Sequence, residues 1–219
     1  MPSLPENWSK NNERVSVMKS AANVLKKKSA FKEEMDRRFP AADSEKAWQK
    51  AHALLDSFYQ KYADLPKGVK LHTDSFIFPA AAIYLAMKEI DPDQAYAVMT
   101  KVMKERSEKI GGKLAGFTKL PGARRLFMNI WDPMCRNMFG EKSGFQNVFY
   151  PKEKDVYRMD ITACPYHKYL TELGCPEINR LFCENDVYTY GSLPGIRFIR
   201  TKTIGQGDEL CNFRLELEK

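Results

Sequence analysis

The stretch Gly195–Leu217 reads GIRFIRTKTIGQGDELCNFRLEL and is a strong signal for a β-hairpin. Segments rich in β-branched and aromatic residues flank Gly205–Asp208, in which two glycines favour a turn. We therefore predict two antiparallel strands, over 195–204 and 209–217. The rest of the chain is interpreted outward from this pair.

Further β-structure is expected just upstream. Phe145–Tyr150 and Val156–Thr162 are short and rich in β-branched or aromatic residues. Two short helices are predicted between the strand pairs, and each begins with a Cys-Pro pair, at Cys164-Pro165 and Cys175-Pro176. Residues 141–219 should therefore form a small antiparallel sheet that carries two helices.

The first 140 residues are predicted to form successive helices, because their apolar residues recur at helical spacing. The first helix extends from about Val15 to Phe39, where Pro40 ends it. Ser44 is the expected N-cap of a second helix, which ends before Pro66.

Three more helices are expected before the sheet. One starts at Pro79 within the apolar run Phe76–Ile90, and Asp91-Pro92 caps the next. Gly111-Gly112 should weaken the end of that fourth helix, and Arg124–Phe139 forms the fifth. The expected inward positions of the fourth helix are Ala95, Val98, Met99, Val102 and Met103.

These signals predict an α+β chain, with a helical N-terminal layer over residues 1–140 followed by the small sheet with its two short helices over 141–219. No Pro-rich or Ser-rich linker separates the two parts. We therefore expect one cooperative unit.

The composition is that of a globular protein, with 43% hydrophobic and 12% aromatic residues in a chain of 219. No apolar stretch approaches a membrane span, and the first residues lack the pattern of a signal peptide. Five cysteines at spacings unlike those of a small secreted scaffold favour a reducing cytoplasm. We expect a cytoplasmic protein that does not enter a membrane; whether it forms a homo-oligomer is left open.

The net charge of +7 is unevenly distributed, with +8 over residues 1–150 and −1 over residues 151–219. The basic excess is most visible at Lys26–Lys28 and Arg37-Arg38. No nucleic-acid-binding module with interleaved aromatic residues accompanies it. A solvated helix face is therefore preferred over a polyanion site, and no nucleic-acid partner is expected.

Cys164 and His167 form the first group that could carry chemistry. Cys164 precedes a proline at a predicted helix start, where the helix dipole and free N–H groups would lower the pKa of its thiol. His167 lies three residues later, near enough to take a proton or share a metal. The alternative is a capping cysteine and an exposed histidine.

A second group contains Cys183 and Asp186, three residues apart on the next predicted helix. Neighbouring carboxylates disfavour a thiolate but suit a cation site. Cys211 alternates with Phe213 on its strand and faces the core side, so it is either core or the floor of a pocket. Cys164, Cys183 and Cys211 could act as scattered metal ligands, and the cofactor is left open between zinc and none.

The remaining candidates are weaker. Cys135 is interpreted as core, and Cys175 as an N-cap-like residue with a structural role. His52 lies among apolar helix positions and is interpreted as a packing residue, whereas His72 is either a capping neighbour or a pocket residue.

Four motifs near the C-terminus resemble one family. They are Cys164-Pro-Tyr-His, Leu173-Gly-Cys-Pro-Glu177, Phe182-Cys-Glu-Asn-Asp186 and Gly207-Asp-Glu-Leu-Cys-Asn-Phe-Arg214, and the family is the L-2-amino-thiazoline-4-carboxylate hydrolases. The resemblance covers about the last 75 residues, and residues 1–140 match only in general character. The chain departs from the family pattern at Asn212, where the family has Asp.

The resemblance implies a hydrolase that opens a small cyclic amidine or isothiourea. Its reaction would convert 2-amino-thiazoline-4-carboxylate to N-carbamoyl-cysteine, by attack at C2 and departure of the ring sulfur. Cys183 or Cys164 would attack C2, or would hold a metal that activates water. Asp186, Glu177 or His167 would move protons, Arg200 would bind the substrate carboxylate, and Cys211 would share the pocket.

Two other classes of function compete with this hydrolase. One is a non-catalytic sensor that keeps the fold and binds a small molecule or a metal. The other is a scaffold whose basic helical surface binds an acidic partner. The sequence motifs favour the hydrolase and a small-molecule substrate.

Overall fold

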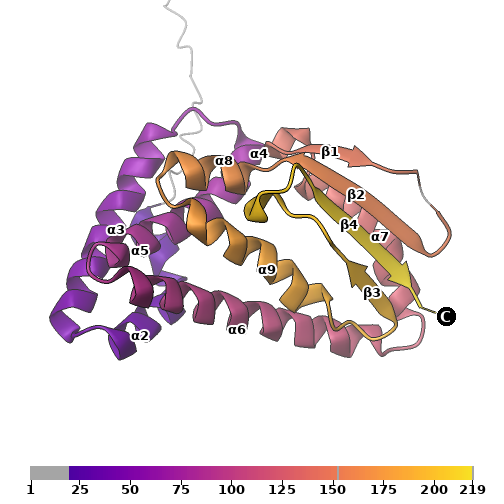
Figure 1. The fold of residues 1–219 in the computed structure, drawn as a ribbon, viewed down its shortest axis with the longest axis horizontal. Coiled ribbons are helices and arrows are strands. Elements are labelled where there is room, and N and C mark those ends of the chain that lie inside the picture. The colour runs from indigo at the N-terminus through magenta and orange to yellow at the C-terminus, as the bar shows by residue number, and fades with distance from the viewer. Residues whose placement is uncertain (1–19, 152, 219) are drawn as a thin grey trace, which may run out of the picture.

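The computed structural model describes residues 20–151 and 153–218, and its fold is α+β, as predicted (Figure 1). Helices make up the N-terminal part, and a four-stranded antiparallel sheet with two further helices follows. Val15, the expected start of the first helix, lies outside the described residues. No described helix combines the length and the apolar character that crossing a membrane requires.

The helices before the sheet are joined by short turns. A π-helical turn, Thr73–Ile77, connects two of them, and a 3-10 turn, Glu141–Ser143, follows the last. Their bounds are α1 Ala21–Lys26, α2 Ser29–Arg38, α3 Ala41–Lys61, α4 Lys67–His72, α5 Phe78–Lys88, α6 Pro92–Thr118 and α7 Ala123–Met138.

The start of α6 follows the predicted capping chemistry. The Asp91 carboxylate accepts hydrogen bonds from the backbone N–H groups of Asp93 and Gln94, both at 3.0 Å, and Pro92 occupies the first turn. The five predicted inward positions of this helix are all buried. Local sequence therefore determined both the start and the buried face of α6.

Gly111-Gly112 lies inside α6, which continues to Thr118, just before Leu120-Pro121-Gly122. A Cβ atom at Gly111 would lie 2.6 Å from the backbone oxygen of Tyr188 on α9 (Asn179–Tyr190). Gly111 therefore allows α9 to pack against the backbone of α6. The packing across this contact offsets the low helix propensity of glycine.

Two further helix starts differ from expectation. Helix α3 begins at Ala41 after Pro40, and Ser44 is buried inside it, where its hydroxyl donates to Asp36 Oδ1 at 2.6 Å. Helix α5 begins one residue before Pro79, which still occupies its first turn. Proline at the start of a helix decided both positions.

The strands are β1 Gln146–Phe149, β2 Val156–Ala163, β3 Ile196–Ile199 and β4 Cys211–Leu217, in the spatial order β1-β2-β4-β3. Strands β3 and β4 form the predicted antiparallel hairpin, but β3 is shorter than expected. The side-chain oxygen of Asn212 accepts hydrogen bonds from the backbone N–H groups of Thr201 and Lys202, at 2.9 and 2.7 Å. Residues 200–210 therefore lie outside the strands and include a 3-10 turn, Ile204–Gln206.

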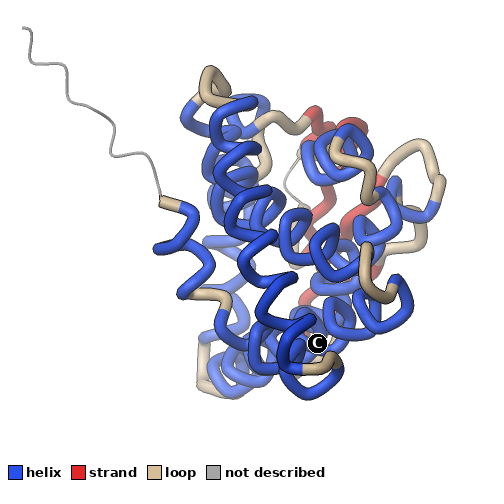
Figure 2. The backbone as a smooth tube through the Cα atoms, turned by 90° about the vertical axis from the view of Figure 1, so that its left-hand side faces the viewer, coloured by secondary structure: helices blue, strands red, loops and turns tan. Residues whose placement is uncertain are grey.

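Two hydrophobic clusters organise the molecule. The first fills the space among the N-terminal helices, and the second lies between α7 and the sheet. Helix α8 (Pro165–Glu172) and α9 lie between the two, and Tyr166 packs against both clusters. Figure 2 shows the helices covering the strands when the molecule is seen from the helical side.

Candidate active site

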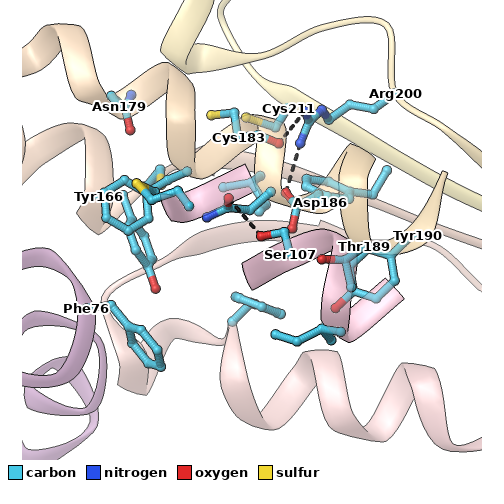
Figure 3. Close-up of a pocket in the computed structure, with 18 of the residues that line it drawn as sticks. Phe76, Ser107, Tyr166, Asn179, Cys183, Asp186, Thr189, Tyr190, Arg200 and Cys211 are labelled. Atoms are coloured by element: carbon cyan, nitrogen blue, oxygen red, sulfur yellow. Dashed lines mark hydrogen bonds and ion pairs between the residues drawn. The ribbon is translucent and has the colours of Figure 1, made fainter. Parts of the chain in front are cut away.

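A cavity of about 310 Å³ lies where α6, α8, α9 and the sheet meet (Figure 3). Most of its wall is aromatic or aliphatic, with side chains contributed by both clusters. Its ionisable side chains, among the described residues, are Lys28, Arg106, Cys135, Cys164, Tyr166, Cys183, Asp186, Tyr190, Arg200 and Cys211. An apolar cavity with a few convergent polar groups is the usual form of a small-molecule site.

Asp186 and Arg200 form the charged centre of the cavity. Arg200 donates from Nη1 to Asp186 Oδ2 at 2.8 Å and from Nη2 to the backbone oxygen of Cys183 at 2.7 Å. Only 5% of the Arg200 side chain is exposed, whereas Asp186 keeps 33%. Asp186 also lines the cavity.

Desolvation controls the acidity of Asp186. Burial raises the pKa of its carboxyl group to about 6, although the charge and hydrogen bond of Arg200 act in the opposite direction. Among the described residues that line the cavity, Asp186 is the one carboxylate. It can therefore exchange protons with a ligand near neutral pH.

The structure brings Cys164, Cys183 and Cys211 to this same cavity, from the start of α8, from α9 and from β4. Figure 3 shows Cys183 and Cys211 beside Arg200. The Cys211 sulfur accepts a hydrogen bond from the backbone N–H of Ile204 at 3.2 Å. Cys211 is thus both buried in the sheet cluster and part of the cavity wall.

The loop before β4 packs closely on this group of thiols. A Cβ atom at Gly205 would lie 2.8 Å from the Cys183 sulfur and 3.0 Å from Nδ2 of Asn179. Glycine is therefore required for the loop to approach α9. The turn that identified the hairpin therefore packs against two residues of the cavity wall, Asn179 and Cys183.

The expected acidic thiol at Cys164 is contradicted. The backbone N–H groups of Tyr166 and His167 do favour its thiolate, but burial is the larger effect and raises its pKa to about 12. Burial also raises the pKa of Cys183 to about 12 and that of Cys211 above its ordinary value. All three thiols are therefore protonated at neutral pH.

His167 and Glu177 do not line the cavity. Nδ1 of His167 accepts a hydrogen bond from the side-chain amide nitrogen of Asn179 at 3.2 Å. The Glu177 carboxylate accepts a hydrogen bond from the Tyr84 hydroxyl at 2.7 Å and forms an ion pair with Lys88, both on α5. These bonds connect the helices to one another, through His167 on α8 and Asn179 on α9 and through Glu177 and α5.

Two other cysteines differ from each other in position. Cys175 is buried in the helical cluster and does not line the cavity. Cys135, interpreted from the sequence as core, lies on α7 and is buried in the sheet cluster, where it also reaches the cavity wall. Its helical spacing from Trp131 reveals the buried face of α7, but no sequence signal distinguishes core from cavity there.

Asn179 is a cavity residue that the sequence did not identify. It is 2% exposed, and its Oδ1 is buried without a hydrogen-bond partner among the described residues. A buried acceptor that lacks a partner costs stability, so a ligand with an N–H group would satisfy it. Its position before Cys183 by one helical turn was the available sequence signal.

The donor set does not form a metal centre. Within residues 20–151 and 153–218, no group of three or more His, Cys, Asp or Glu side chains is arranged to hold a metal ion. Cys164, Cys183 and Cys211 share the cavity without converging as ligands. The residues present therefore do not fit the zinc site that the sequence left open.

Comparisons with known proteins agree with the motifs. The family model described as L-2-amino-thiazoline-4-carboxylic acid hydrolase matches residues 71–215. The match extends upstream of the motifs into the helical part, and it leaves out Lys28. No curated protein and no solved structure gives a significant match.

Proposed function

The chain belongs to the L-2-amino-thiazoline-4-carboxylic acid hydrolase family, and from this premise we propose that it opens a small cyclic amidine or isothiourea by hydrolysis. The observation that carries the proposal is the Asp186 carboxylate, which lines a mostly apolar cavity together with the thiols of Cys135, Cys164, Cys183 and Cys211. The substrate of the founding activity, 2-amino-thiazoline-4-carboxylate, carries the two nitrogens that a carboxylate and an amide oxygen bind.

Substrate binding follows from the polar groups of the cavity. One oxygen of Asp186 is held by Arg200, so the other is available for the amidine N–H groups of the ligand. The unpaired Oδ1 of Asn179 accepts a further N–H. The low polarity of the surrounding wall strengthens both interactions relative to water.

Asp186 is the group that transfers protons in this proposal. At neutral pH a carboxyl group with a pKa of about 6 is mainly ionised, and it is also a competent acid once it is protonated. The Arg200 guanidinium fixes its position and stabilises its charged form. The same residue therefore serves as base when the nucleophile attacks and as acid when the ring sulfur leaves.

Cys183 is the proposed nucleophile. With a pKa of about 12 its thiol needs a base, and Asp186 is the carboxylate of the cavity that can serve. As the sulfur bonds to C2, the thiol proton passes through Asp186 to the ring nitrogen. The ring C2–sulfur bond then breaks, and a proton from the amidine nitrogen passes through Asp186 to the departing sulfur.

Hydrolysis of the resulting isothiourea completes the cycle. Water adds to the same carbon, and one of its protons passes through Asp186 to the imino nitrogen. The remaining hydroxyl proton passes through Asp186 to the Cys183 sulfur as that sulfur leaves and the carbonyl forms. The product from 2-amino-thiazoline-4-carboxylate is N-carbamoyl-cysteine, and one water has been consumed. A direct attack of water on C2, with Asp186 as base, would give the same product without a covalent intermediate.

A non-catalytic small-molecule-binding role is the second candidate. It is favoured by the protonated thiols and by the predominantly apolar cavity wall, which suit binding without turnover. In this role the Asp186 carboxylate would only pair with a cationic ligand.

A substrate screen separates the two functions. Purified protein is incubated with cyclic amidines, isothioureas and hydantoins, and mass spectrometry detects products that have gained one water. The hydrolase predicts turnover of an isothiourea or amidine, with loss of turnover in Asp186→Asn. Binding of panel members without turnover of any would support the second candidate instead.

A further inference from the structure

The cavity has a second charged end, at the opposite side from Asp186. Figure 3 shows Phe76 and Arg200 at opposite ends of the cavity. Lys28 lies beside Phe76, with Nζ 5.4 Å from the ring centroid, and Lys28 and Arg106 both line the cavity. Two cations therefore occur at the end that the proposed chemistry does not use.

Lys28 is held in place by the residues around it. Its side chain is half-buried, and its ammonium group donates to the backbone oxygen of Ser75 at 2.9 Å. Burial, and then the charge of Arg106, lower its pKa to about 8. Both side chains line the cavity, Lys28 from the turn between α1 and α2 and Arg106 from α6.

Arg106 lies immediately before Ser107, whose hydroxyl donates to Asn185 on the cavity wall at 2.9 Å. Arg106 is exposed. In the described part of the chain, no carboxylate forms an ion pair with Lys28 or with Arg106. Two neighbouring cations without a counter-charge favour an anion between them.

Much of the cavity wall is apolar. It includes Phe31, Ile83 and Met103, which α2, α5 and α6 contribute. The cavity volume of about 310 Å³ is at the lower end of the range for sites that enclose drug-sized ligands, which is about 300–1,000 Å³. A ligand with an apolar body fits this wall better than a compact ring alone.

We propose that Lys28 and Arg106 form a carboxylate-binding subsite, and that the cavity accepts elongated ligands with an apolar body, a carboxylate at this end and an amidine-type group at Asp186. Only the amidine end rests on the proposed function. Arg200, the carboxylate partner expected from the sequence, is already bonded to Asp186 and to the Cys183 backbone. Lys28 lies outside the family match, so it would determine a specificity particular to this chain.

Calorimetric titration of the full chain tests the subsite with three probes. The first is para-amidinophenylpropanoate, the second its primary amide, and the third phenylpropanoate, which lacks the amidine. We expect the carboxylate to bind about tenfold more tightly than the amide, because two charge-assisted contacts are lost with the charge. Lys28→Met and Arg106→Gln should each remove most of this preference.

Neighbouring lysines outside the cavity supply matched controls. Lys27→Met and Lys109→Gln change the same net charge, and both should keep the carboxylate preference. Arg106→Gln breaks no hydrogen bond of the described residues, so its fold should persist, and thermal unfolding checks this for every variant.

The outcomes separate this inference from the proposed function. Equal binding of carboxylate and amide, or a preference that survives both cavity variants, would overturn the subsite, as would the absence of binding by all three probes. A carboxylate preference that depends on Lys28 and Arg106 supports it. If that preference is found but para-amidinophenylpropanoate binds no more tightly than phenylpropanoate, the subsite is supported and only the proposed role of Asp186 is contradicted.

Discussion

The Tyr166 hydroxyl donates a hydrogen bond to Nδ1 of His72, with Nδ1 and the phenol oxygen 3.0 Å apart. The direction is set by the other ring nitrogen, because Nε2 lies 2.8 Å from the Met138 backbone oxygen, which can only accept. Burial lowers the pKa of His72, so the neutral ring with its proton on Nε2 is stable. This pair joins the helical layer to a side chain of the cavity wall.

We predict that Tyr166→Phe destabilises the protein by about 1–3 kcal/mol, because Nδ1 of buried His72 loses its donor. Urea unfolding measures the change. Tyr188→Phe is the control, since no hydrogen bond of the Tyr188 hydroxyl occurs among the described residues and its removal should leave the midpoint nearly unchanged. Equal midpoints for both variants would show that the His72–Tyr166 bond contributes nothing.

The pH dependence of turnover should report the Asp186 carboxyl group. Its pKa is raised to about 6, and the proposed base must be ionised, so kcat/KM should rise as pH increases through about 6 and then level off. Initial rates on the best substrate of the screen measure this profile. In Asp186→Glu, kcat/KM should still rise with pH, but about a shifted midpoint. If the residual kcat/KM of Asp186→Asn rose about the same pH as in the wild type, the rise would belong to another group.

Cys183→Ala should abolish turnover while substrate still binds, because the variant removes the nucleophile and keeps the apolar wall. Rapid quenching of the wild type, followed by intact-mass measurement, should reveal a covalent adduct that Cys183→Ala lacks. Cys175→Ala is the control, since Cys175 is buried outside the cavity. Full turnover by Cys183→Ala would favour direct attack by water.

The two adjacent glycines of α6 should respond oppositely to alanine. Gly111→Ala places a Cβ atom 2.6 Å from the Tyr188 oxygen, so α6 and α9 must separate, at a cost of about 1–3 kcal/mol. Gly112 is exposed with open space beside it, so Gly112→Ala should stabilise by about 0.5–1 kcal/mol. Thermal unfolding measures the midpoint of both variants. Midpoint shifts of the same sign in the two variants would contradict the close contact of α6 with α9 at Gly111.

The sequence by itself determined those features that depend on neighbouring residues. Short-range hydrogen bonding and side-chain periodicity account for the Asp91 cap, for the buried face of α6 and for the β3–β4 hairpin that ends at Leu217. The motifs around Cys164 and Cys183 lie in the part of the chain that contributes Cys164, Cys183 and Asp186 to the cavity. Periodicity also directed Cys211 inward, although it could not distinguish core from cavity.

Only the tertiary structure decided which of these groups meet and in which charge state. Glu177 does not line the cavity and instead bonds to Tyr84 and Lys88, both on helix α5, which is distant in the sequence. Lys28 reaches the cavity from the N-terminal part of the chain, and Arg200 forms an ion pair with Asp186. The thiol of Cys164 illustrates the physical reason: the helix start that should acidify it is a local effect, whereas desolvation depends on everything packed around it and is the larger of the two.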